Sequence, residues 1–89
     1  MSKHKPRAAT RFDKIVGGYI RAVRQSAKVS QTDLADNVGV TFQQIQKYEK
    51  GTNRITVERF AKICDHLNQC PAKALQLVLA RSASGADYA

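Results

Sequence analysis

Gln43, Gln46 and Lys47 recur at three- and four-residue spacing, so they share one face of any helix that contains them. A glutamine amide both donates and accepts, and it can bond bidentately to the edge of adenine. A lysine ammonium can donate to the acceptors of guanine or to a phosphate. An ordinary solvated helix would present the same residue types. The assignment of this face to DNA bases therefore depends on the elements that hold it.

A short helix is predicted immediately before this face. Ser30 followed by Asp33 resembles a capping box, and the helix then runs from residue 31 to about residue 38. Gly39 supplies the permissive backbone that a sharp turn into the next helix requires. This capped helix and tight turn favour the DNA interpretation over a plain solvated surface.

The helix that carries the polar face is itself delimited at both ends. Thr41 with Gln44 makes a second capping box, and Gly51 stands where a left-handed C-terminal cap is expected. On a helical wheel, Ile45 and Tyr48 lie close together and should face the core. The glutamines and the lysine then occupy the opposite arc, where the major groove of DNA could receive them.

Phe42 begins the same helix and allows two interpretations. Its ring could pack inward or present apolar surface to a thymine methyl group. Gln31 and Thr41 each stand at the start of a predicted helix, where the dipole and free backbone N–H groups favour phosphate, although both positions also suit helix caps. The candidate base-reading residues are Phe42, Gln43, Gln46 and Lys47.

A polar loop is predicted directly after the second of these helices. Its side chains could hold the DNA backbone, although a solvated loop would have the same composition. The candidate phosphate-binding residues in this loop and in the two helices are Gln31, Thr41, Gln44, Lys50, Thr52, Asn53 and Arg54.

Length and charge agree with a polyanionic partner. The chain has 89 residues, enough for one small domain, and a formal net charge of +8. The first residues are basic and lack helical periodicity, so they predict a flexible arm that could contact DNA, or one that only aids solubility. The basic residues of this arm, which spans residues 1–11, are Lys3, Lys5, Arg7 and Arg11.

Apolar periodicity predicts three further helices. Asp13 is the expected N-cap of a first helix, in which Gly17 and Gly18 indicate close approach of another backbone or a later start. Thr56 can cap a fourth helix, and Pro71 suits the first turn of a fifth. The expected buried stripe of the fourth helix comprises Val57, Phe60, Ala61, Cys64 and Leu67.

The fifth helix carries more apolar residues than a short terminal helix needs for its own core. Some of them should be shared with a second subunit, although packing into the helix's own domain is the alternative. The candidates for a dimer interface are Leu75, Leu77, Val78 and Leu79.

Five short helices and no alternating strand pattern predict an all-α fold. The compact helical domain should span residues 12–81, between the flexible arm and a flexible tail of small and polar residues over 82–89. The second and third helices then form a helix-turn-helix.

Several segments together resemble the lambda-repressor-like helix-turn-helix family, the Xre and Cro/CI type of bacterial and phage transcriptional regulators. The resemblance covers roughly residues 16–79, and its carriers are IRAVR, SQTDLADNVGVT and IQKYEKGTNRI. The run TFQQIQKYEKGTNRI is similar to a subgroup common in alphaproteobacterial regulators. Two departures are the absence of a proline after the Tyr-Glu-x-Gly element and the absence of a sensory or cleavable domain.

The resemblance implies roles for individual residues. Gln31 and Thr41 would touch phosphate, the polar face of the third helix would read bases, and Phe42 would lie near the floor or wall of the groove. It also implies that Arg24 pairs with Glu49. A bidentate guanidinium at that point would tie the first helix to the end of the reading helix.

Other chemistries find little support. Cys64, His66 and Cys70 could suggest a metal site, but they lack a common face and a fourth ligand with suitable spacing. No spacing assembles a catalytic nucleophile with a base, and no glycine-rich loop follows a strand, so no enzyme activity, metal or cofactor is expected. No signal peptide or membrane span is recognisable, which predicts a cytoplasmic protein. No pocket for a small molecule is evident from the sequence.

The sequence therefore predicts a sequence-specific DNA-binding transcriptional regulator. The simplest form is a homodimeric repressor that binds a palindromic operator in double-stranded DNA through the major groove. The alternative is an antitoxin-like module that masks a toxin and autoregulates its operon.

Overall fold

The structure is a computed structural model that describes residues 10–84. Five helices follow one another within this range: α1 (Arg11–Ser26), α2 (Gln31–Val38), α3 (Phe42–Lys50), α4 (Val57–His66) and α5 (Pro71–Ser84). The described residues contain no strand. The all-α prediction and the positions of the second and third helices are confirmed.

The first helix begins earlier than expected. Thr10 is its N-cap, because the Thr10 hydroxyl accepts from the backbone N–H of Asp13 and the Asp13 carboxylate accepts from the N–H of Thr10, each at 3.1 Å. The assignment of Asp13 as the cap was wrong, because its carboxylate completes a capping box from inside the first turn. Arg11 consequently belongs to α1 and not to an arm. Lys3, Lys5 and Arg7 lie outside the described residues.

The other predicted helix ends agree with the structure. The side-chain oxygens of Ser30, Thr41 and Thr56 each accept from a backbone N–H in the first turn of the helix that follows. Gly39 and Gly51 have φ of +77° and +76°, in the left-handed region that glycine adopts without strain. At the far end, α5 continues through Ser84, so the expectation that residues 82–84 belong to a flexible tail was wrong. Residues 85–89 lie outside the described residues.

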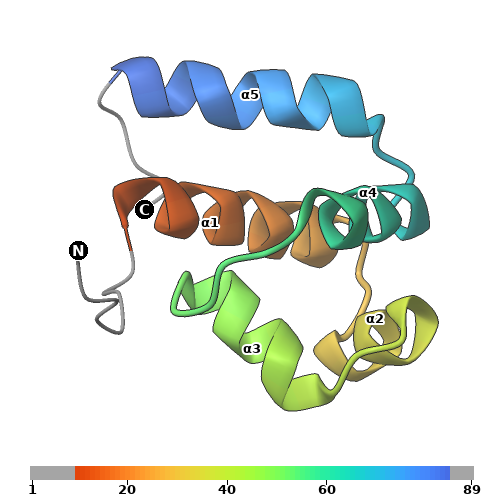
Figure 1. The fold of residues 1–89 in the computed structure, drawn as a ribbon. Helices are drawn as coiled ribbons and strands as arrows, with labels where there is room; N and C mark the ends of the chain where they lie inside the picture. The colour runs from red at the N-terminus through yellow and green to blue at the C-terminus, as the bar shows by residue number, and fades with distance from the viewer. Residues whose placement is uncertain (1–9, 85–89) are drawn as a thin grey trace.

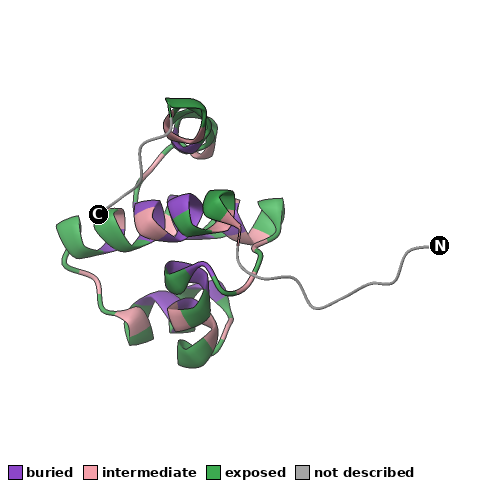
Figure 2. Cartoon of the chain, turned by 90° about the vertical axis from the view of Figure 1, so that its left-hand side faces the viewer, coloured by how far each residue is buried: buried purple, intermediate pink, exposed green. Residues whose placement is uncertain are grey.

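The core receives side chains from all five helices, which Figure 2 shows as buried segments turned toward the centre. Two expectations need correction. Val57 is 82% exposed because it is the first residue of α4 and precedes the point at which the helix packs on the core. Val78 is fully buried with Ala74, so it fills the monomer's own core and is unavailable to a second subunit. The largest fully buried residues are Ile15, Ile20, Leu34, Ile45, Ile63 and Val78.

Gly17 explains how α1 and α3 come together. A Cβ atom at this position would lie 2.2 Å from the carbonyl oxygen of Tyr48, where no side chain fits. The expectation of a close backbone approach is therefore confirmed for Gly17. Because α3 rests directly on the backbone of α1, the orientation of α3 is fixed by the longest helix of the domain.

The helices form two groups on either side of α1. In Figure 1, α5 lies along one side of α1, and α2 and α3 lie on the opposite side. Figure 2 gives the same arrangement after a quarter turn. Among the residues that the structure describes, no helix is both long and apolar enough to cross a membrane.

Candidate nucleic-acid interface

Helix α3 has one face in the core and the other in solvent. Ile45 is fully buried and Tyr48 is 9% exposed, as the helical wheel predicted. Gln43 and Lys47 are exposed on the other side, with Gln46 half-buried beside them. We call the surface made of Gln43, Gln46 and Lys47 the reading face.

Phe42 lies at the start of the reading face. Its side chain is 39% exposed, so a substantial part of the ring is available as apolar surface at the N-terminus of α3. This exposure leaves room for contact with a thymine methyl group and excludes full inward packing.

Arg24 and Glu49 hold the end of α3 against α1. The Nε of Arg24 donates to Oε2 of Glu49 at 2.6 Å, and a second guanidinium nitrogen donates to Oε1 at 3.0 Å. Both residues are buried, at 9% and 8% exposure. The remaining guanidinium nitrogen donates to the carbonyl of Val29 at 2.9 Å, in the loop before α2. The pair that the resemblance implied is therefore present, and it also ties down the start of the helix-turn-helix.

Gln31 joins the same network from the first residue of α2. Its side-chain nitrogen donates to Oε1 of Glu49 at 2.9 Å. The carboxylate thus receives hydrogen bonds from α1 and α2 while it belongs to α3. A sequence pattern gave no sign of this bond, because it joins residues eighteen positions apart that lie on separate helices.

The loop after α3 closes the end of that helix. The backbone N–H of Thr52 donates to the carbonyl of Lys47 at 3.0 Å, and the Thr52 hydroxyl donates to the same carbonyl at 3.3 Å. Lys50 and Thr52 are exposed, and Asn53 is half-buried. At the other end of α3, Thr41 is exposed and caps the helix, and Gln44 is half-buried. The loop and both ends of α3 thus carry exposed or half-buried polar groups.

The helix-turn-helix family model matches residues 20–75, which is more than half of the chain. The chain belongs to this helix-turn-helix family. Its relatives include an HTH-type transcriptional regulator of Sinorhizobium medicae, 46% identical over 67 residues that make up 75% of this chain and 46% of the relative. A transcriptional regulator in the ATPase CF(0) region of Rhodospirillum rubrum is 40% identical over 67 residues, covering 75% of this chain and 62% of that protein. The Xre-type resemblance and its alphaproteobacterial subgroup are confirmed.

Solved structures show the same fold at lower identity. The clp gene regulator ClgR from Corynebacterium glutamicum superposes with a TM-score of 0.77 at 21% identity, over 86% of this chain and 82% of that one. A mutant of the restriction-modification controller protein C.Esp1396I superposes with a TM-score of 0.73 at 17% identity, over 80% of this chain and 95% of that one. The chain spans about half the length of the first curated relatives that it matches.

Two arginines connect helices of the domain through hydrogen bonds. The sequence predicts no role for Arg59, and it places Arg11 in the N-terminal arm. Arg59 of α4 donates to the carbonyl of Val38 at 2.8 Å, at the C-terminal end of α2 and just before the Gly39 turn. Arg11 donates to the carbonyls of Ser82 and Arg81 at 2.9 and 3.4 Å, so it ties the start of α1 to the end of α5. Its expected DNA contact remains a prediction.

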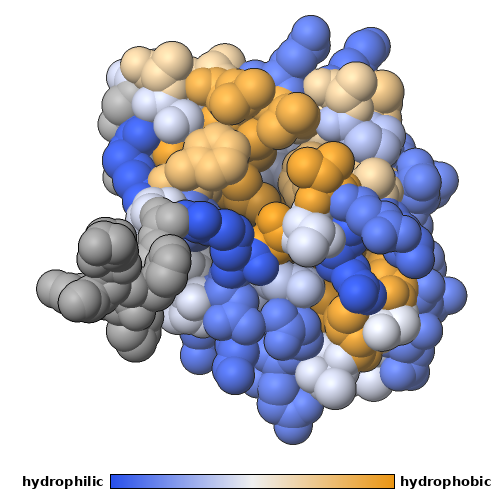
Figure 3. Space-filling view, viewed as in Figure 1, coloured by the Kyte–Doolittle hydropathy of each residue, from blue (hydrophilic) through white to orange (hydrophobic). Residues whose placement is uncertain are grey.

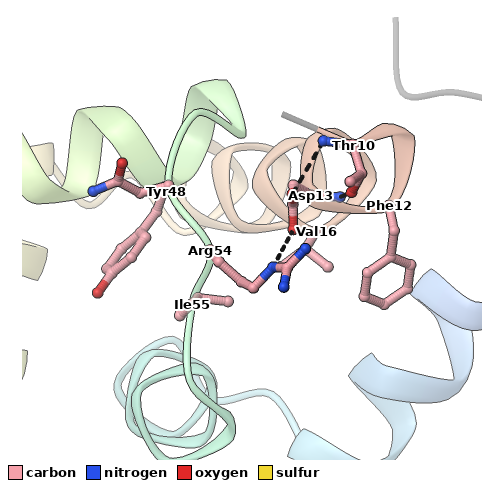
Figure 4. A pocket seen from close by; sticks show the side chains of 8 residues that line it. Thr10, Phe12, Asp13, Val16, Tyr48, Arg54 and Ile55 are labelled. Carbon is pink, nitrogen blue, oxygen red and sulfur yellow. Dashed lines mark hydrogen bonds and ion pairs between the residues drawn. The ribbon is translucent and has the colours of Figure 1, made fainter. Parts of the chain in front are cut away.

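Arg54 is directed to the domain and away from the reading face. Its Nε lies 3.8 Å from Oδ1 of Asp13, across a hollow of about 470 Å³ between the start of α1 and the loop after α3. Figure 4 shows the guanidinium reaching from the loop toward Asp13. The hollow was not anticipated from the sequence, because its walls come from segments far apart in the chain.

An apolar surface lies on α5 and beside it. Leu75, Leu77 and Leu79 are exposed, at 42%, 56% and 50%. Leu75 also lines a small apolar hollow of about 100 Å³ together with Phe12 and Val57. Figure 3 shows hydrophobic side chains gathered on this face between α5 and the start of α1.

The two cysteines and His66 differ in burial and in their neighbours. Burial raises the pKa of the Cys64 thiol to about 11, so this cysteine is an apolar core residue at neutral pH. Cys70 is exposed before α5, and hydrogen bonds from the backbone N–H groups of Lys73 and Ala72 lower the pKa of its thiol. His66 lies 3.3 Å from the carboxylate of Asp33 on α2. Within residues 10–84, no three His, Cys, Asp or Glu side chains group as metal ligands.

Proposed function

We propose that this chain is a sequence-specific DNA-binding transcriptional regulator, acting as a homodimeric repressor on a palindromic operator. The observation that carries the proposal is the reading face of α3, on which Gln43 and Lys47 are exposed and Gln46 is half-buried while the helix beneath them is fixed. Gly17 fixes the contact of α3 with α1, and Arg24 and Glu49 fix its end. A side chain can discriminate between bases only if its backbone is held in a constant register.

In this proposal α3 enters the major groove of double-stranded DNA. Gln43 and Gln46 pair with adenine edges through their amides, and Lys47 donates to guanine. Phe42 supplies apolar contact at the N-terminal end of the helix. The phosphates on either side of the groove are held by the start of α2, by both ends of α3 and by the loop after α3, at Gln31, Thr41, Gln44, Lys50, Thr52 and Asn53. Arg54 can join them only by leaving Asp13.

Dimerisation is proposed through α5. Because α5 lies on the opposite side of α1 from α2 and α3, two copies can present both reading faces to one duplex only if they meet side by side (Figure 1). The two-fold axis then runs along the direction from α5 toward α3. The two reading faces would meet successive turns of the major groove on one side of the DNA, and the bound dimer would block RNA polymerase.

Substitution of the reading face tests the assignment of base contacts. Gln43→Ala and Lys47→Ala should each reduce the free-energy difference between specific and non-specific binding by about 1 to 3 kcal/mol per half-site, the discrimination that one good base contact supplies. The measurement is a fluorescence-anisotropy titration with the selected operator and with random DNA of the same length.

Thr32→Ala provides the matched control, because Thr32 is exposed on α2 but lies outside the reading face. It should leave the ratio unchanged. If the two reading-face variants kept the wild-type ratio among DNA sequences, these residues would not read bases.

The exposed apolar side of α5 also suits the antitoxin-like alternative, in which a different protein covers Leu75 and Leu79. Sedimentation of the purified chain separates the two. A dimer without a second protein supports the repressor, whereas a monomer that forms a stoichiometric complex with the product of an adjacent gene supports the alternative.

A further inference from the structure

A basic hollow adjoins the reading face on the side of α1. It has a volume of about 280 Å³, and every side chain that lines it is polar or charged. The lining residues come from α1, from the first residue of α2 and from α3, and they are Arg21, Arg24, Gln31, Gln46, Glu49 and Lys50.

The charges in this hollow are not balanced. Three cations and one carboxylate leave a net charge of +2. Arg24 and Glu49 neutralise each other, and both oxygens of Glu49 are already occupied by hydrogen bonds. The excess charge therefore belongs to Arg21 and Lys50. Both are exposed, and neither makes an ion pair or hydrogen bond through its side chain within residues 10–84.

The position of the hollow relates it to DNA. Gln46 belongs both to the lining and to the reading face, so the hollow begins where the reading face ends. A helix that occupies the major groove has the sugar-phosphate backbone directly beside it. The N-terminus of the eight-residue helix α2 also adjoins the hollow at Gln31, and its free backbone N–H groups and dipole favour an anion.

We propose that this hollow binds one DNA backbone phosphate through the paired charges of Arg21 and Lys50. The inference rests on the proposed function, because it requires α3 to lie in the major groove. Arg21 acts as the bidentate ligand, since a guanidinium matches two phosphate oxygens, and Lys50 adds a point charge from α3. The side-chain nitrogen of Gln31 already donates to Glu49, so the two cations carry the charge of this contact. Arg21 thus anchors α1 to the phosphate that flanks the reading face.

The salt dependence of DNA binding tests this contact. Arg21→Gln should weaken binding to the operator and to random DNA by the same factor. It should reduce the slope of log affinity against log salt by about 0.9 for each bound subunit, which is about 1.8 for the homodimer. Lys73→Gln is the matched control. It removes one exposed positive charge from α5, on the side of α1 away from α2 and α3, and should leave the slope unchanged.

DNA in which single phosphates are replaced by an uncharged group identifies the phosphate that Arg21 contacts. Replacement of single phosphates by methylphosphonate in each half-site should identify one position at which wild-type binding falls and the Arg21→Gln variant loses nothing further. Additive losses at every position would overturn the assignment of Arg21 to a phosphate. A slope for Arg21→Gln equal to that of Lys73→Gln would do the same.

Two further outcomes are separable. If the wild-type chain selects a DNA sequence but Arg21→Gln behaves like the control, the phosphate site is wrong and the proposed function stands. If the wild-type chain selects no sequence, the proposed function itself fails. Free inorganic phosphate has the same chemistry as a DNA phosphate, and NMR titration distinguishes the two ligands. A shift of the Arg21 Nε resonance with inorganic phosphate but none with operator DNA would overturn the DNA assignment.

Discussion

At the scale of single residues, Glu49 is the side chain that connects α3 to both α1 and α2. Its carboxylate belongs to α3 and receives hydrogen bonds from Arg24 on α1 and Gln31 on α2. A buried carboxylate with three donors both neutralises a buried guanidinium and sets the relative positions of three helices. Glu49 thus holds α3, with its reading face, against α1 and α2.

Glu49→Leu should destabilise the domain by about 3 to 5 kcal/mol, because it leaves the Arg24 guanidinium buried without a counter-charge. The measurement is urea-induced unfolding followed by circular dichroism. The double variant Arg24→Met with Glu49→Leu is the control. It removes both charges and should recover most of the loss, since apolar residues of similar volume can replace a buried pair. A loss for the double variant equal to the sum of the losses of Arg24→Met and Glu49→Leu would show that the two residues act independently.

At the scale of helices, most of what the sequence predicted concerns local chemistry. Ser30, Thr41 and Thr56 cap helices, and Gly39 and Gly51 end them, because each bond involved joins residues a few positions apart. The periodicity of α3 likewise separated its buried face from its reading face. These features depend on near neighbours and can be inferred from the order of residue types.

The predictions that were wrong, and the contacts that were not predicted, involve segments far apart in the sequence. Val78 had the same apolar character as its neighbours, and only the position of α1 and α4 shows that it faces the core. The bonds of Arg59 to the end of α2 and of Gln31 to Glu49 cross between helices. Periodicity gives the angle of a side chain on its own helix, but it does not say which neighbour covers that angle.

The apolar residues of α5 fall on two flanks of that helix. Each residue rotates the helix by about 100°, so Leu75 and Leu79 follow the buried Ala74 and Val78 on one flank, and Leu77 lies on the other. Only the Leu75 flank continues into the apolar hollow with Phe12 and Val57. We expect the dimer to form on that flank.

Leu75→Glu should convert the dimer to monomers, because a charge at the centre of an apolar contact is costly to bury. Leu77→Glu places the same charge on the opposite flank of α5, and this variant should remain dimeric. Sedimentation velocity gives the oligomeric state, and circular dichroism confirms that both variants keep their helices. Dissociation by Leu77→Glu alone would assign the interface to the opposite flank.

At the scale of the whole molecule, the domain separates three tasks. In the proposed assembly α2 and α3 would meet DNA on one side of α1, the apolar flank of α5 would meet a second copy beside it, and α1 would join the two regions (Figure 1). The net charge of +8 would support association with any DNA, whereas the reading face would supply the preference among sequences. The fold therefore matches the division between affinity and specificity that a regulator requires.

Selection of bound oligonucleotides from a random double-stranded pool tests the central claim most directly. The homodimer should enrich a palindromic sequence whose half-sites are separated by about one turn of the duplex, 10 to 10.5 base pairs from centre to centre. The half-sites should contain the adenine and guanine contacts expected of glutamine and lysine. A pool that remains random after repeated rounds, with binding that depends only on salt, would contradict sequence-specific recognition by this chain.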